Sequence, residues 1–408
     1  MKKYLLFFIL ALVAASCSSA QRTDGESIAQ SRINDGWQTL TPEAAGLNDE
    51  KLSELTDFIH ADPHSDFRSV VIAKDGKIAF EGYFNGHDPE SLHDIRSATK
   101  SITSMMVGIA IEDGLIADVK EPVFSTLSAY APFANDGPRK QAITVENLLT
   151  MASGLHADDD NSDSPGNEDF LWESDDWVRF SLDLPMADEP GSRWSYASVN
   201  TFLLGVLVEE ASMESLSSHA KKHLFAPLGI TNFDWRSEPS GRTVAQGNLA
   251  IRARDMLKLG QLYLDGGRWN GIQVVPETWV QTSIVGRFDV PWDDYDAYGY
   301  GWYLHTLNIE GREFQYFFAS GNGGNKIYVL PKERMVVAVQ SAAYNTNYGQ
   351  RRSLEVLRKV LAALVASGVR RLTHFTATRF PSPQETRRTT WQVGSNWVIA
   401  RMGSSASF

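Results

Sequence analysis

The chain has 408 residues, of which 43% are hydrophobic and 22% charged, a composition typical of a globular protein. This length allows one large domain or two smaller ones. The formal net charge of −12 disfavours nucleic acid and other anionic surfaces as partners, because no basic face would offset the repulsion.

The first twenty residues have the pattern of a targeting segment. Two lysines precede the apolar run 4–13, which is too short to span a bilayer, and small residues follow it. Two kinds of processing stay open: residues 14–17 (AASC) resemble a bacterial lipobox, after which a lipid on Cys17 attaches the protein to a membrane, or an ordinary signal peptidase cuts after Ala20. Either way we expect an exported protein, periplasmic or anchored in the outer membrane, and without a disulfide because Cys17 is the only cysteine.

The body of the chain is expected to follow a linker at 21–40. Residues 69–84 (SVVIAKDGKIAFEGYF) predict a hairpin around Asp75-Gly76. Apolar side chains at 102, 105, 106 and 109 then follow helical spacing. Further helices are predicted from the N-cap Thr144 to Gly154, over 200–212, over 252–267 and over 354–366, and two more strands within 325–341.

Strands from both ends of the chain with helices between them indicate an α/β fold. We expect one catalytic domain at 41–366, with an antiparallel sheet built from about 41–115 and 285–366, flanked by helices, and a mostly helical insertion at about 116–284. The segment 367–408 carries six Arg, no Lys and a single Glu, so it is expected to be a basic tail outside the fold. Binding of this tail to an anionic surface stays open.

Ser97 and Lys100 stand three positions apart at the start of an apolar helix. This spacing fits a nucleophile with its activating amine, but it also fits an ordinary polar first turn. A second pair with the same spacing, Ser218 and Lys221, shows that spacing alone does not decide. Two later motifs add context: Tyr196-Ala197-Ser198 before a predicted helix, and Ala319-Ser320-Gly321 before a glycine turn and a strand.

The order of these three motifs resembles that of the serine β-lactamase-related hydrolases. This family includes class C β-lactamases, D-alanyl-D-alanine peptidases, family VIII esterases and 6-aminohexanoate-dimer hydrolase, and S-x-x-K is a signature of related enzymes. Longer segments also stand in family order, from about Thr41 to Ala366. The resemblance implies a β-lactamase/transpeptidase-like fold and selects Ser97 over Ser218, which has no tyrosine motif after it.

The resemblance also implies roles for the site residues. Ser97 would form an acyl-enzyme, and Tyr196, assisted by Lys100, would take the serine proton and pass it to the leaving group. The backbone N–H groups of Ser97 and Asn322 would bind the oxyanion. Substrate contacts are expected from Ser198, Ser320 and Gly321. No cofactor or metal is expected, because the nine His are scattered and the chain has no His-Glu-x-x-His.

The third motif departs from the β-lactamase pattern in a way that bears on substrate. Ala319 stands where the family carries a cation, and Ser198 where it carries Asn. We therefore expect a small-molecule ester or linear amide as the substrate rather than a β-lactam. Two alternatives stay open: β-lactamase or D-alanyl-D-alanine peptidase activity, and a non-catalytic, lipid-anchored binding protein on the same fold.

Residues 156–177 hold nine Asp or Glu and no basic residue. This stretch is either a solvated, mobile loop or a border of the cleft that attracts an amine-bearing substrate, as an acidic residue does in amide-hydrolysing relatives. A calcium loop is a weaker alternative, because the spacing lacks the glycine and glutamate of an EF-hand.

Overall fold

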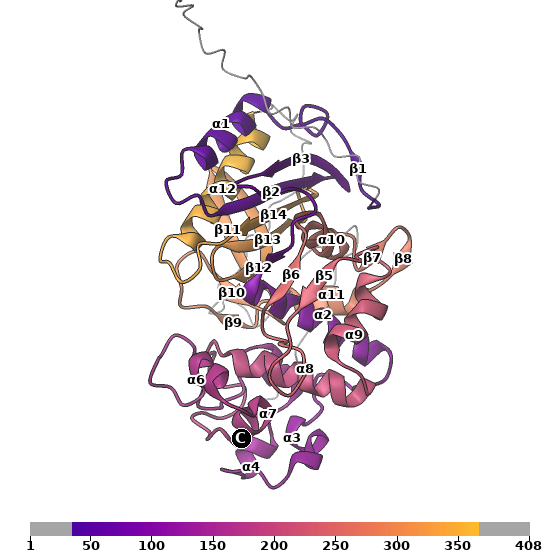
Figure 1. The fold of residues 1–408 in the computed structure, drawn as a ribbon, viewed down its shortest axis with the longest axis vertical. Helices are drawn as coiled ribbons and strands as arrows, with labels where there is room; N and C mark the ends of the chain where they lie inside the picture. The colour runs from indigo at the N-terminus through magenta and orange to yellow at the C-terminus, as the bar shows by residue number, and fades with distance from the viewer. Residues whose placement is uncertain (1–34, 367–408) are drawn as a thin grey trace, which may run out of the picture.

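The structure is a computed structural model that describes residues 35–366 (Figure 1). The targeting segment with Cys17 and the basic segment 367–408 lie outside the described residues, so the expectations for them stay predictions. Within the described range, no helix is both long and apolar enough to cross a membrane.

A nine-stranded sheet forms the upper half of the molecule in Figure 1, in the order β1-β3-β2-β14-β13-β12-β11-β10-β9. The strands are β1 (Gln38–Thr39), β2 (Phe67–Lys74), β3 (Lys77–Tyr83), β9 (Phe288–Asp289), β10 (Ala297–Tyr298), β11 (Tyr303–Ile309), β12 (Arg312–Gly321), β13 (Asn325–Leu330) and β14 (Met335–Ser341). Strand β14 pairs with β2, so the two ends of the chain meet in the sheet as predicted. All neighbours are antiparallel except β1 and β3, and β1 lies within the segment expected to be a linker.

The first predicted hairpin is confirmed as β2 and β3. Its two turn residues both have left-handed backbone angles, with φ of 50° at Asp75 and 75° at Gly76. Two successive positive φ values suit a tight turn whose twist matches that of the strands, which is why Asp-Gly is favoured there.

Helices cover both faces of the sheet. Helices α1 (Asp49–His60) and α12 (Gly349–Ala366) pack together over one face, shown at the top of Figure 1. Helices α2 (Thr99–Glu112), α10 (Ala253–Leu264) and α11 (Glu277–Ser283) belong to the core on the other face. Helix α10 falls inside the range expected for the helical insertion, yet it packs against β13, β14 and β2.

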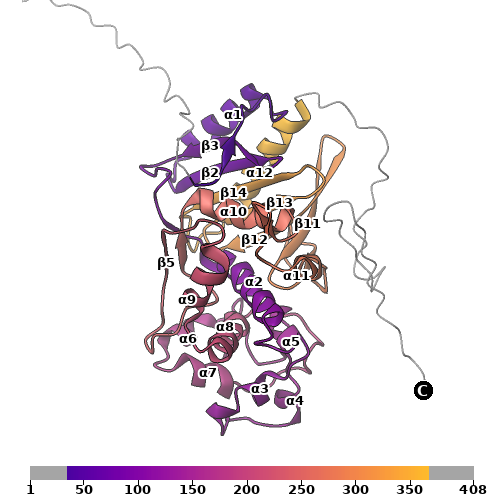
Figure 2. The same ribbon diagram turned by 90° about the vertical axis from the view of Figure 1, so that its right-hand side faces the viewer.

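The remaining helices gather below the sheet, and α2 runs between the two parts (Figure 2). They are α3 (Val123–Thr126), η2 (Ser128–Tyr130), α4 (Pro138–Gln141), α5 (Val145–Leu149), α6 (Glu168–Glu173), α7 (Trp177–Asp183), α8 (Ser198–Ser212) and α9 (Leu216–Ala220), the last continuing into a π-helical turn, η3 (Lys221–Phe225). Two small sheets lie beside them, formed by β4 (His93–Asp94), β6 (Leu249–Ile251) and β5 (Phe233–Trp235), and by β7 (Arg268–Trp269) and β8 (Ile272–Gln273).

Thr144 caps α5 as predicted, in a reciprocal capping box with Asn147. The helix ends at Leu149 rather than at Gly154. The reason is a left-handed residue, Met151 with φ of 57°, which turns the chain before the glycine is reached.

We expect Gly260→Ala to destabilise the fold although alanine is the better helix former. A β carbon built on Gly260 lies 2.5 Å from Val336 Cγ1 and 2.7 Å from Ile327 Cγ2, both in the fully buried sheet. Overpacking costs about 1–3 kcal/mol, against a gain of about 1 kcal/mol in helix propensity. Urea denaturation should show a net loss of about 1 kcal/mol, the middle of the range that these two figures leave. An unchanged or higher midpoint would mean that α10 does not press on the sheet this closely.

Candidate active site

Ser97 lies in a short 3-10 turn, η1 (Arg96–Ala98), that leads directly into α2. The residue before it, Arg96, has a left-handed backbone with φ of 53°, and its N–H donates to Asp94 Oδ1 at 2.8 Å. Non-glycine residues rarely adopt this conformation, and such strain is concentrated at functional sites. The Ser97 side chain is half-buried, so a substrate can reach it.

Lys100 is buried one turn further along, and its ammonium group has three partners. Lys100 Nζ lies 3.0 Å from Ser97 Oγ, 3.0 Å from Ser198 Oγ and 3.0 Å from the carbonyl oxygen of Gln246. Burial lowers the pKa of Lys100, while the nearby carboxylates of Glu168 and Asp159 act in the opposite direction. A lower pKa increases the fraction of Lys100 that is a neutral amine at physiological pH, and the neutral amine can accept a proton.

Tyr196 completes the group just before α8. Lys100 Nζ lies 4.9 Å from the centroid of its ring. Burial raises the pKa of Tyr196 well above its usual value, and a hydrogen bond with Ser97 offsets this in part. The raised pKa favours the protonated hydroxyl, which can donate its proton, and the role of Tyr196 as the base stays a prediction.

Ser198, expected to contact substrate, is fully buried and faces Lys100 instead. The hydroxyl orients the lysine amine, and substrate contact is not open to it. The second S-x-x-K pair is different again: Ser218 and Lys221 are both exposed, and the Ser218 hydroxyl lies 2.8 Å from Ser215 Oγ. The structure thus brings together the first pair and not the second.

The end of β12 presses against the Ser97 turn. A β carbon on Gly321 would lie 2.0 Å from the Ile95 carbonyl oxygen and 3.0 Å from the Ala98 nitrogen, so only glycine allows this approach. The next residue, Asn322, has its side chain paired with Asn345, donating at 2.6 Å and accepting at 2.9 Å. This pairing fixes the backbone of Asn322 next to the turn that carries Ser97.

A lysine from the next strand lies beside the third motif, although position 319 itself is Ala. Lys326 is directly opposite Ser320 in the β12–β13 ladder, and its Nζ donates to Ser320 Oγ at 2.7 Å and to Tyr295 Oη at 2.7 Å. The rings of Tyr295 and Phe318 each lie 4.9 Å from Lys326 Nζ, measured to the ring centroid. Burial lowers the pKa of Lys326 well below its usual value. A buried amine therefore lies beside the third motif, and the loss of a cation at position 319 stays a prediction. The strand pairing that reveals Lys326 carries no short-range signal in the sequence.

Part of the acidic stretch borders the site. Asp159 accepts the Ser198 N–H through Oδ2 at 2.7 Å and the Glu168 N–H through Oδ1 at 3.0 Å, and its own N–H donates to the Tyr196 carbonyl at 2.8 Å. Burial, and then the negative charge of Glu168, raise the pKa of Asp159 to about 7. The solvated-loop interpretation is thus wrong for Asp159, which is half-buried and caps α8.

We expect Asp159→Asn to move the acidic limb of the kcat/KM–pH profile to lower pH. The carboxylate favours the Lys100 ammonium, so its removal lowers the pKa of Lys100 further, while the asparagine carbonyl can still accept the Ser198 N–H.

The stability of Asp159→Asn gives a second readout. Because the folded-state pKa of Asp159 is raised to about 7 from 3.8, ionisation opposes folding increasingly between these values. The variant should therefore gain stability over the natural protein as pH rises through this window, and not below it.

Asp163→Asn is the matched control for this experiment, since Asp163 is an exposed member of the same stretch. It should leave both the pH profile and the stability difference unchanged. Equal shifts in the two variants would point to overall charge rather than to contact with Lys100.

Aromatic side chains form the wall beside Tyr196. The Trp292 ring centroid lies 5.3 Å from that of Tyr196 and 5.4 Å from that of Tyr295, and Trp292 Nε1 donates to Asp160 Oδ2 at 2.9 Å. Trp292 is half-buried and Asp160 is exposed. The approach to Ser97 thus combines an apolar surface with one accessible carboxylate.

The large sheet with helices on both faces, and a buried lysine joining a serine turn to a tyrosine, define a β-lactamase/transpeptidase-like α/β protein. A family model described as Beta-lactamase matches residues 67–364, and the chain belongs to that family.

Individual relatives agree with this assignment. The chain is 25% identical over 292 residues to 6-aminohexanoate-dimer hydrolase of Paenarthrobacter ureafaciens, covering 67% of this chain and 72% of that one. It is 23% identical to a protein of Escherichia coli (strain K12) provisionally named D-alanyl-D-alanine carboxypeptidase, over 57% of this chain, and spans only 55% of that relative.

Solved structures show the same fold. A family VIII carboxylesterase superposes with a TM-score of 0.62 at 17% identity, over 77% of this chain and 97% of that one. The D-amino acid amidase of Ochrobactrum anthropi SV3, complexed with L-phenylalanine amide, gives 0.59 at 18% identity, over 78% and 99%. The resemblance inferred from the motifs is confirmed: the chain is a member of a serine hydrolase family that acts on amides and esters.

Proposed function

We propose that the protein hydrolyses an ester or a linear amide through an acyl-enzyme on Ser97. The observation that carries this proposal is the 3.0 Å contact between the buried Lys100 Nζ and Ser97 Oγ, with Tyr196 beside both. A structural lysine gains little from burial without a carboxylate in direct contact, whereas a general base gains a lower pKa.

The three partners of Lys100 suit a neutral amine. Two N–H bonds can point at the Gln246 carbonyl and the Ser198 hydroxyl, which leaves the lone pair for the Ser97 proton. In the proposed acylation, Ser97 Oγ attacks the substrate carbonyl carbon as Lys100 accepts the proton. The Tyr196 hydroxyl then passes a proton to the departing alcohol or amine and regains one from Lys100.

The developing oxyanion would be bound by the backbone N–H groups of Ser97 and Asn322. The contact between Gly321 and Ile95–Ala98 supports this, because it brings the two segments together. Deacylation runs the same proton path in reverse, with water in place of the leaving group. The scheme uses groups of the chain, the substrate and the water that hydrolyses the acyl-enzyme.

For the amide reaction, the more specific proposal is that the substrate carries an amine. The accessible carboxylate of Asp160 next to Trp292 supports it, as does the name of the 6-aminohexanoate-dimer hydrolase relative. If neutralising residues 158–160 leaves KM for a cationic amide unchanged, this finer proposal fails. β-Lactamase or D-alanyl-D-alanine peptidase activity is the second candidate, favoured by the lysine amine of Lys326 beside Ser320. Export, with or without a lipid on Cys17, belongs to the same proposal and rests on the sequence.

Covalent labelling tests the core of the proposal. A fluorophosphonate probe should modify Ser97 in the natural protein, identified by peptide mass, and should not modify Ser97→Ala. Ser218→Ala serves as the matched control and should label fully. Absence of labelling in folded protein would instead support a non-catalytic binding protein. A panel of a short-chain ester, a linear amide and a chromogenic cephalosporin then ranks the substrates, and efficient cephalosporin turnover would overturn the ester and linear-amide assignment.

A further inference from the structure

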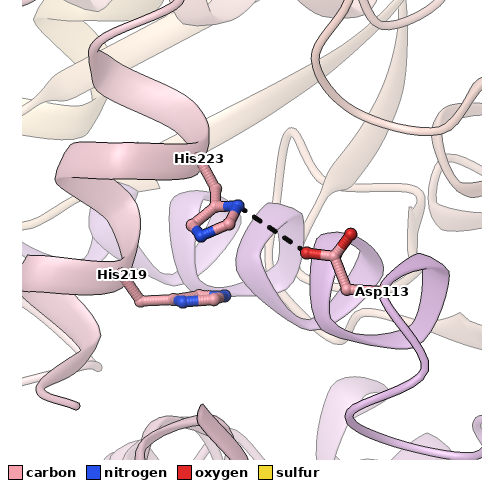
Figure 3. Close-up of side chains that lie close together, drawn as sticks. All are labelled: Asp113, His219 and His223. Atoms are coloured by element: carbon pink, nitrogen blue, oxygen red, sulfur yellow. Dashed lines mark ion pairs between the residues drawn. The ribbon is translucent and has the colours of Figure 1, made fainter.

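Three side chains that can bind a metal meet at the end of α2 far from Ser97. They are Asp113, the C-cap residue of α2, His219 in α9 and His223 in η3 (Figure 3). Each offers one ligand atom, and all three atoms lie within 4.8 Å of one another. In Figure 3 the two imidazole rings lie one above the other, tilted by 31°, and Asp113 faces His223.

His219 is the anchor of this cluster. Its side chain is only 3% exposed, and Nδ1 lies 3.0 Å from Glu214 Oε1. The other ring nitrogen, Nε2, is buried and has no hydrogen-bond partner among the described residues. A buried polar atom without a partner is costly. A carboxylate on one ring nitrogen, with the other free, is the usual arrangement of a metal-ligating histidine, because it fixes the tautomer and raises basicity.

The other two ligands can complete a coordination sphere. His219 and His223 are four residues apart, and their ring centroids lie 4.3 Å apart. His223 Nδ1 lies 3.7 Å from Asp113 Oδ2. Ligand atoms around a tetrahedral zinc with bonds of 2.0–2.1 Å are about 3.4 Å apart. The side chains of His223 and Asp113 are 41% and 43% exposed, so they can close the remaining gap by small rotations.

We propose that Asp113, His219 and His223 form a binding site for a divalent transition metal, with zinc as the best match. Two imidazoles and one carboxylate suit zinc and its transition-metal neighbours, whereas calcium and magnesium prefer oxygen ligands alone. The C-terminal end of α2 adds a favourable field for a cation. The nearest competing charge, Lys222, is already paired with Glu214 on the oxygen that does not face His219.

The site is separate from the hydrolytic centre. Asp113 is thirteen positions after Lys100, which corresponds to about 20 Å along a helix. A bound metal would link the end of α2, the helix that carries Lys100, to the α9–η3 segment. The sequence alone does not predict this cluster, because Asp113 lies more than a hundred residues before the two histidines in the chain.

Metal binding to chelator-treated, tag-free protein tests the proposal. Zinc titration by calorimetry should give one equivalent per chain, and cobalt should give the intense visible absorption of a low-coordinate site with nitrogen ligands. His223→Ala and Asp113→Asn change exposed side chains and should fold normally, yet each should weaken zinc binding at least tenfold. Glu214→Gln should weaken it about tenfold through His219. Zinc should raise the melting temperature of the natural protein and not of His223→Ala.

His305→Ala is the matched control, because His305 also pairs with an exposed aspartate, Asp296, at 2.9 Å. It should bind zinc like the natural protein. The proposal is overturned by the absence of a stoichiometric zinc isotherm at micromolar protein, or by equal binding in the natural protein, His223→Ala and Asp113→Asn. These readouts do not depend on hydrolytic activity.

Discussion

Lys100→Met is expected to lower kcat/KM for an activated ester about 1,000-fold, within the range that general-base catalysis contributes. The variant loses the only nitrogen within hydrogen-bonding distance of Ser97 Oγ among the described residues, and methionine fills a similar volume. The fold should survive, because removing a buried amine offsets the cost of leaving the Gln246 carbonyl and Ser198 hydroxyl without that partner. Stopped-flow ester hydrolysis and urea denaturation measure the two effects separately.

Two further variants sharpen this experiment. Lys221→Met removes the lysine of the second S-x-x-K pair, which is exposed, and should leave kcat/KM unchanged. Lys100→Arg keeps a positive charge that cannot be given up near neutral pH. If Lys100 acted only as a charge, the arginine variant would retain much of the activity that the methionine variant loses. We expect both to be equally inactive.

Local patterns in the sequence were enough to predict the elements that carry the site. Periodicity predicted that α2 is a helix, and the Asp-Gly turn predicted the β2–β3 hairpin, because both depend on residues close together in the chain. Periodicity did not predict that α2 is buried on all sides from Thr99 to Ala110. The Ser97–Lys100 contact also follows from local spacing, since positions i and i+3 share a helix face. Choosing this pair over Ser218 and Lys221 needed the family resemblance.

Contacts between distant segments could not be predicted in the same way. Lys326 reaches Ser320 because β12 and β13 pair in one particular register, and Asp159 reaches Ser198 because a loop folds back on α8. Acidic stretches and lysines in strands are common in proteins, and many of these side chains are exposed to solvent. Only the fold shows that Asp159 is half-buried and that Lys326 is almost fully buried.

Lys326→Met should lower kcat/KM about tenfold or more, because it removes two hydrogen bonds at the strand end that leads to the oxyanion turn. Ser320 is half-buried, so its hydroxyl can meet a substrate while Lys326 polarises it from behind. Burial lowers the pKa of Lys326, and a bound carboxylate would favour its protonation. The loss should therefore be larger for an ester with a carboxylate in its acyl chain than for a neutral ester of equal length.

Lys332→Met, in the exposed turn of the same hairpin, controls for the loss of one positive charge. It should change neither substrate's kcat/KM. If Lys326→Met loses kcat/KM equally for both esters, the role of Lys326 is only to hold β12 in place. A selective loss for the anionic ester would mean that the third motif still recognises an anion, with its cation supplied by the next strand rather than by position 319. The preference for esters and linear amides would then rest on the aromatic wall at Trp292 and the carboxylate of Asp160, and no longer on Ala319.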